Sequence, residues 1–135
     1  MLPLLNAIYS FFTSTGALTS AFLGGLHRDQ APPGTGMPYV VSKVVSSQTE
    51  FAYGGATRSN IQISFSAFGV GHDAVGALAE TLVEQFDGAS LTLSSGTNDV
   101  VLRKGDPTPT LHGQDGVGND VWEWAVVYEF GVVEP

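Results

Sequence analysis

The chain has 135 residues, the length of one domain, and carries five Lys and Arg against 13 Asp and Glu, for a net charge of −8. A hydrophobic content of 43% excludes an intrinsically disordered chain, and five basic residues are too few to neutralise many phosphates of a nucleic acid. The absence of cysteine excludes disulfides, thiolate metal sites and cysteine nucleophiles. Charged residues make up only 13% of the chain, so we expect part of its surface to be buried in an assembly.

The apolar N-terminal segment predicts a helix over residues 3–14, because its large apolar side chains recur at helical spacing and Pro3 suits the first helical position. A second short helical turn is expected over 17–22, ended by two glycines. The first basic side chain is Arg28, so the positive start of a secretory signal is missing. We therefore expect an unprocessed product made in the cytoplasm, and no stretch approaches the ~20 apolar residues of a membrane span.

A long hairpin is predicted next. Residues 27–37 are rich in Pro and Gly and indicate a connector. From Pro38 the period changes to two, and the same alternation can continue as far as Tyr53. A turn at two glycines then leads into an alternating strand over 58–68. The far end of this hairpin is expected to project beyond what one small domain covers.

The segment 73–86 predicts a second main helix. Asp73 is a suitable N-cap, and Gly88 suits a left-handed stop. The helix carries one apolar stripe, formed by Val75, Leu78, Ala79, Leu82 and Phe86. Glu80 and Glu84 lie on its other side, where a solvated helix face is a simpler explanation than acid–base chemistry.

The last third of the chain predicts strands and one long loop. Leu91 with Leu93, and residues 100–102, indicate short strands, and 103–120 indicates a long polar loop. Residues 121–132 form the strongest strand, with both tryptophans on one face. The expected fold class is α+β, as a single domain over 1–135: two helices packed on one face of a mainly antiparallel four- to five-stranded sheet, with a long projecting hairpin.

No catalytic, cofactor-binding or metal site is predicted. The histidines His27, His72 and His112 lack any metal-ligand spacing. The segment 115–120 looks like a calcium loop, but Val117 stands where an oxygen ligand is needed, so a turn is the better interpretation. The sequence also lacks a nucleophile elbow and a P-loop lysine.

Three short signatures resemble one known family. The segments are GALTSA at 16–21, GGLHRD at 24–29 and, most tellingly, APPGTGMPYVV at 31–41. Together with the order of elements, they resemble the small tail-completion proteins of long-tailed bacteriophages, also called tail terminators or head-to-tail joining proteins. The resemblance covers nearly the whole chain, although the loop at 103–120 is longer and richer in Gly and Pro than the family leads us to expect.

The resemblance implies a virion structural protein, without catalysis or cofactor, that forms a ring of six subunits. This ring would cap the tail tube and join it to the head connector. The implied partners are further copies of the chain, the major tail tube protein and a head-completion or connector protein. DNA would only pass through the lumen, for which an acidic chain is suited. A role on the portal side, which a related subfamily has, stays open.

Two segments are expected to make the contacts of this assembly. The hairpin end carries Phe51, Tyr53 and Arg58, and aromatic and Arg side chains often anchor protein contacts. The loop at 103–120 contributes Asp115 and Asp120.

Two alternatives belong to other classes of protein. One is a small soluble ligand-binding α+β domain that holds an apolar ligand near Trp122 and Trp124. The other is a hydrolase that uses His72 and a carboxylate from the loops.

Overall fold

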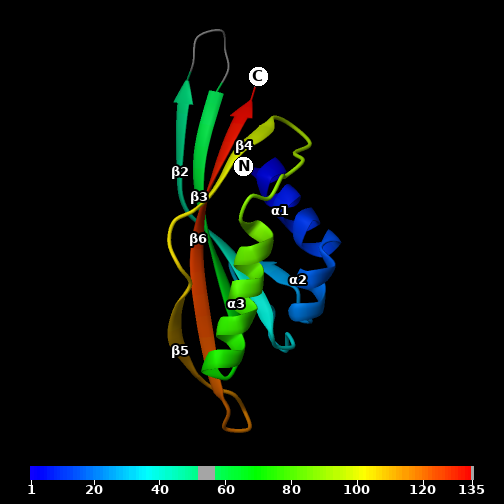
Figure 1. The fold of residues 1–135 in the computed structure, drawn as a ribbon, viewed down its shortest axis with the longest axis vertical. Coiled ribbons are helices and arrows are strands. Elements are labelled where there is room, and N and C mark those ends of the chain that lie inside the picture. Colours follow the sequence, from blue (N-terminus) through cyan, green and yellow to red (C-terminus); the bar gives the residue numbers. More distant parts are fainter. Residues whose placement is uncertain (52–56, 135) are drawn as a thin grey trace.

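The computed structural model describes residues 1–51 and 57–134, in three helices and a six-stranded sheet (Figure 1). In chain order the elements are α1 (Leu2–Ser14), α2 (Gly16–Ala21), β1 (Leu26–Arg28), β2 (Tyr39–Phe51), β3 (Thr57–Val70), α3 (His72–Phe86), β4 (Thr97–Arg103), β5 (Thr108–Gln114) and β6 (Asp120–Glu134). The strand order is β1-β2-β3-β6-β4, and β5 also pairs with β6. Only the β1–β2 pair is parallel, so the predicted α+β class with a mainly antiparallel sheet is confirmed.

The centre of the sheet is the antiparallel pair β3 and β6, which stay in register from Thr57 opposite Glu134 to Val70 opposite Val121. Alternate side chains of both strands face the helices, as the period of two predicts. The buried members are Ile61, Ile63, Phe65 and Ala67 on β3 and Val126, Tyr128, Phe130 and Val132 on β6. Trp122 and Trp124 pack against this core from the same face of β6.

All three helices cover one face of the sheet and leave the other face without helices (Figure 1). Of the predicted apolar stripe of α3, Leu78 is partly buried and the other four residues are fully buried, whereas Glu80 and Glu84 are exposed. The ring of Phe86 lies 4.8 Å from that of Phe65 and 5.0 Å from that of Phe11, measured between centroids, so it joins sheet, α3 and α1. Fully burying an aromatic side chain of this size stabilises a fold by about 1.5–3 kcal/mol.

The predicted cap of α3 is wrong. The N-cap is Gly71, whose φ is +91°, and Asp73 lies inside the first turn without capping it. A positive φ suits glycine, and it turns the chain sharply from β3 into the helix. The negative carboxylate of Asp73 still interacts favourably with the positive N-terminal end of the helix dipole. At the other end Gly88 has φ +70°, as predicted for a left-handed stop.

The structure contains two strands where the sequence predicts connections. β1 lies at the start of the expected connector and is too short, at three residues, to show a period. β5 lies within the expected loop at 103–120, and all its residues are exposed, so no apolar alternation marks it. It contains Pro109, which an edge strand tolerates. By contrast, Leu91 and Leu93, predicted as a strand, lie outside any strand.

The hairpin of β2 and β3 is confirmed, and its end extends past the helices, together with the ends of β4 and β6 (Figure 1). The unbroken alternation predicted for β2 is wrong, because Val45 forms a one-residue bulge between Val44 and Ser46. The bulge exchanges the two faces of the strand, so Ser47 and Thr49 continue the face of Val44. Tyr53, to which the alternation was extended, lies outside the described residues.

Candidate assembly interface

The first predicted contact segment lies at the projecting end of the sheet. Phe51 is the last residue of β2, and Tyr53 falls outside the described residues. Arg58 on β3 forms an ion pair with Asp99 of β4, across the intervening strand β6. Its hydrogen bond to Asp99 raises the pKa of the Arg58 guanidinium. The Arg58 side chain therefore joins β3 to β4 while one third of it stays exposed.

Gly131 of β6 lies between Arg58 and Asp99 and makes room for them. A Cβ atom at this position would lie 2.5 Å from Arg58 Nη2 and 2.6 Å from Asp99 Oδ1. The ion pair can cross β6 at this point because the strand has no side chain there.

The second predicted pair lies at the opposite end of the sheet. Asp115 caps the β5–β6 turn: its Oδ1 accepts the backbone N–H groups of Val117 and Asn119, each at 2.9 Å. These bonds lower the pKa of the Asp115 carboxyl. Asp120 begins β6, and its Oδ1 accepts a weak 3.4 Å bond from Gln114 Nε2.

The structure does not bring the two predicted contact segments together. Arg58 pairs with Val133, whereas the Asp115 turn precedes Val121 on the same strand β6. Val133 and Val121 are 12 steps apart along β6, which corresponds to roughly 40 Å. A contact through both segments would therefore use both ends of the molecule, and their role in assembly stays a prediction.

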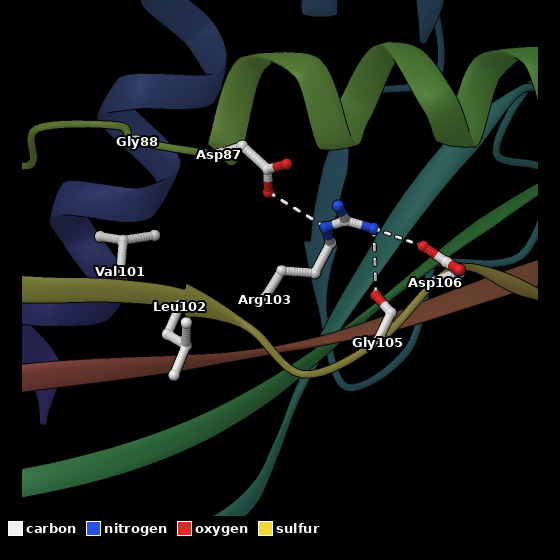
Figure 2. A pocket seen from close by; sticks show the side chains of 7 residues that line it. All are labelled: Asp87, Gly88, Val101, Leu102, Arg103, Gly105 and Asp106. Carbon is white, nitrogen blue, oxygen red and sulfur yellow. Dashed lines mark hydrogen bonds and ion pairs between the residues drawn. The ribbon is translucent and has the colours of Figure 1, made fainter.

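Sequence reasoning missed an open hollow of about 410 Å³ beside β4 (Figure 2). Its lining combines the end of α3 with β4 and the connection to β5, and consists of Asp87, Gly88, Val101, Leu102, Arg103, Gly105 and Asp106. Arg103 crosses the hollow between two carboxylates (Figure 2). Its Nη1 donates to Asp106 Oδ1 at 2.7 Å, and its Nε lies 3.3 Å from Asp87 Oδ1.

Tyr128 completes this network from the sheet. Its hydroxyl donates to Asp87 Oδ1 at 2.7 Å. Burial, and then the bond to Asp87, raise the pKa of Tyr128 far above its ordinary value. The phenol is thus held neutral, and the guanidinium lies between two carboxylates. No local signal links these residues, because Tyr128 and Asp87 are 41 positions apart.

A second hollow, of about 300 Å³, lies beside Trp124. Its lining combines Glu80, Glu84, Asp106 and Arg103 with the apolar side chains of Val83, Pro107 and Trp124. Trp124 Nε1 donates to the backbone oxygen of His72 at 3.0 Å, and the imidazole lies 5.1 Å from the Trp124 ring. The tryptophan therefore holds the start of α3 in place.

The three histidines have structural contacts. The His72 ring lies against both tryptophans, with its Nδ1 2.8 Å from Asp73 Oδ1. On the helix-free face a row of rings crosses the sheet, from His27 through Tyr39 and Phe68 to His112, with centroid distances of 6.2, 5.1 and 5.1 Å. Within residues 1–51 and 57–134, no group of three or more His, Asp and Glu is placed to hold a metal ion.

None of the helices in the described part of the chain is long and apolar enough to cross a membrane.

Comparison with known proteins finds a likeness in structure and none in sequence. The sequence matches no protein-family model and no curated protein. In structure, the chain is similar to a chain in the solved virion of a native gene transfer agent particle, with a TM-score of 0.64 and 18% sequence identity. The likeness covers 95% of this chain and 92% of the other. It therefore shows that the two chains share one fold over almost their whole length.

Proposed function

We propose that this protein is a structural component of a phage-like virion, which forms a ring that caps the tail tube and joins it to the head connector. The observation that carries the proposal is the shared fold with a chain of a gene transfer agent virion, over 95% and 92% of the two chains. The sequence resemblance to tail-completion proteins, strongest over residues 31–41, supports the same role from separate evidence.

The shape and charge of the chain suit this role. Its sheet extends beyond the helices, so strand ends and edges are available for contacts with other subunits (Figure 1). With five basic residues against 13 acidic ones, a ring of such chains would hold DNA weakly in its lumen. The partners under this proposal are further copies, six in the ring, the tail tube protein and a head-side connector protein.

The alternative of a ligand-binding domain has less support. Its ligand would need an apolar pocket near Trp122 and Trp124, whereas Trp122 does not line the hollow beside Trp124, and acidic residues and Arg103 share that lining. For the hydrolase alternative, the structure offers the 2.8 Å contact between His72 Nδ1 and Asp73 Oδ1, but the same imidazole packs against both tryptophans at the start of α3.

The test is binding to tail tubes assembled from the tube protein of the same particle. Negative-stain images are expected to show the protein at one end of each tube, and tubes with this cap should stop growing. An unrelated acidic protein of similar size is the control. Tubes that stay uncapped and continue to grow in excess protein would overturn the proposal.

A further inference from the structure

Among residues 1–51 and 57–134, no strand pairs with the outer edges of the sheet at its projecting end. On one edge, β1 pairs only with residues Val40, Val41 and Ser42 of β2, and Asp29 N then donates to Ser42 O at 2.8 Å. Beyond this bond, no strand of the described residues pairs with the outer side of β2. On the other edge, β4 pairs with β6 and with no second strand in the part of the chain that the structure describes. Unpaired strand edges are templates for pairing with another chain.

The two free edges lie at the same height of the sheet. The pairings place residues of β2, β3, β6 and β4 opposite one another in rows across the sheet. Three such rows, each given in the strand order β2, β3, β6 and β4, are Val44, Ile63, Tyr128 and Arg103; Ser47, Ile61, Phe130 and Val101; and Thr49, Ser59, Val132 and Asn98. A copy of the chain placed beside the first, without a shift along the strands, therefore brings its β4 next to β2.

The strand directions also match. Each step from β2 to β3, β6 and β4 is antiparallel, so β2 and β4 run in opposite directions. A β4 strand added beside β2 would thus extend the sheet as another antiparallel pair, which forms well-aligned hydrogen bonds.

The backbone groups of the two edges are complementary as well. The backbone groups of Val40 and Ser42 point away from β3 and bond to the β1 segment. The bulge at Val45 shifts this alternation by one residue, so beyond it the backbone groups that point away from β3 are those of Ser47 and Thr49. On β4, the N–H of Lys104 points inward and donates to Val127 O. Backbone groups alternate between the two sides along a strand, so those of Leu102 also point inward and those of Val101 point outward. Ser47 and Val101 of the same row therefore both present N–H and C=O groups to the outside.

Exposed aliphatic side chains flank these edges. Val45 in the bulge of β2 is 56% exposed, and Leu102 of β4 is 49% exposed. Both lie near one row across the sheet. In this row Glu129 of β6 is opposite Leu102 of β4 on one side and Gln62 of β3 on the other, and Gln62 is opposite Ser46 of β2, the residue after Val45. Joining the edges would bring these apolar groups together and remove them from water.

We infer that copies of this chain join by adding the β4 edge of one copy to the β2 edge of the next, with Ser47 opposite Val101 of the neighbouring copy. The contact is heterologous, so each added copy leaves one free edge of each kind, and only a closed ring satisfies all of them. The inference rests on the ring of the proposed function and adds which surfaces form it.

A pair of cysteines tests the register, because the chain has no cysteine of its own. Gln48 and Val100 share a row with Asn60 and Gly131 and would be a non-hydrogen-bonded pair between copies, with Cα atoms about 4.5 Å apart. Such a spacing permits a disulfide. Within one chain the two positions are three strand spacings, roughly 14 Å, apart and cannot be bridged.

Mild oxidation of Gln48→Cys/Val100→Cys is expected to give a ladder of cross-linked multimers that ends at the ring size and collapses on reduction. The matched control is Gln48→Cys/Ser64→Cys, whose second cysteine lies on β3 inside the sheet, and it should give no ladder beyond dimers. A double variant that yields only monomers and dimers, like the control, would overturn the inference.

A backbone variant tests the hydrogen bonds. Ser47→Pro removes an outward N–H and leaves the β2–β3 bonds in place, whereas Ser47→Ala keeps the N–H. By light scattering, Ser47→Pro should be monomeric and Ser47→Ala should assemble as the wild type does. A folded Ser47→Pro that assembles normally, or a wild type that stays monomeric at every concentration, contradicts the edge contact. If Ser47→Pro fails to fold, the cysteine ladder decides.

The tube-capping assay on the same proteins separates the two proposals. Tubes that are capped without any ladder from the cysteine pair would overturn the edge contact and leave the proposed function standing. A ladder that closes on a ring without capping tubes would overturn the tail role and leave the edge contact standing.

Discussion

The hydroxyl of Tyr128 donates a 2.7 Å hydrogen bond to Asp87 Oδ1, which connects the middle of β6 to the residue that follows α3. The same carboxylate oxygen lies 3.3 Å from Arg103 Nε at the end of β4. One buried phenol, one carboxylate and one guanidinium thus connect the sheet, the helix layer and the start of the β4–β5 connection. The network fixes β4 at the edge where we place the neighbouring copy.

Replacing Tyr128 by Phe removes this hydrogen bond and should lower the free energy of unfolding by about 1.5–3 kcal/mol, because the acceptor is a charged carboxylate. Urea denaturation followed by circular dichroism measures the change. Tyr9→Phe is the matched control: its side chain is 48% exposed, and the change should stay within about 0.5 kcal/mol. Equal effects of the two substitutions would show that the Tyr128 bond adds nothing.

The same network predicts a loss of stability at alkaline pH. Burial and the bond to Asp87 raise the pKa of Tyr128, so the folded chain keeps this proton where the unfolded chain, with a tyrosine pKa near 10, releases it. The contribution is therefore fully present below about pH 10 and is lost as the pH rises further. Phenolate absorbance should show one of the four tyrosines ionising only with unfolding. This late transition should be missing in Tyr128→Phe.

The sequence predicts those parts of the fold in which burial leaves a periodic trace. β3, β6 and α3 each bury one face, so their apolar residues recur at two or at three to four positions. β5 could not be predicted in this way, because all its residues are exposed and its partner strand is chosen by the turn at Asp115. The bulge at Val45 leaves no trace either, since valines precede it on both faces.

In the candidate site, too, some features could be predicted from the sequence and others could not. Residue type singled out Arg58 and Asp115, but it could not show that Arg58 is paired with Asp99 or that Asp115 caps a turn. The free edges depend on which strands end beside β2 and β4, which is a property of topology. Small polar residues such as Ser47 carry no signal of an edge, because the groups that matter there belong to the backbone.

The crossing of the Arg58–Asp99 pair over Gly131 predicts an effect of one added methyl group. Gly131→Ala would place a Cβ 2.5 Å from Arg58 Nη2 and 3.2 Å from Val100 Cβ, so the ion pair must move and Val100 must give by a few tenths of an ångström. Because the nearest atoms are the ends of flexible, part-exposed side chains, the expected loss is that of the displaced ion pair, about 0.2–1 kcal/mol. The matched control is Gly116→Ala, since nothing lies within 4 Å of a Cβ there. Thermal melting of both variants checks the difference, and equal melting temperatures would contradict the crowding at Gly131.

The Asp115 turn predicts a local change at acid pH. Hydrogen bonds from Asn119 and Val117 lower the pKa of Asp115 in the folded chain, so its contribution is present above the ordinary carboxyl pKa near 3.8 and is lost as the pH falls through the lower folded value. Amide hydrogen exchange of Val117 and Asn119 should therefore accelerate at that acid end, while the amides of the β3–β6 pair stay protected. Asp115→Ala should remove the protection of the two turn amides at every pH, and Asp115→Asn, which keeps an acceptor oxygen, should retain part of it without the acid transition. Protection of both amides in Asp115→Ala equal to that in the wild type would show that the carboxylate does not hold the turn.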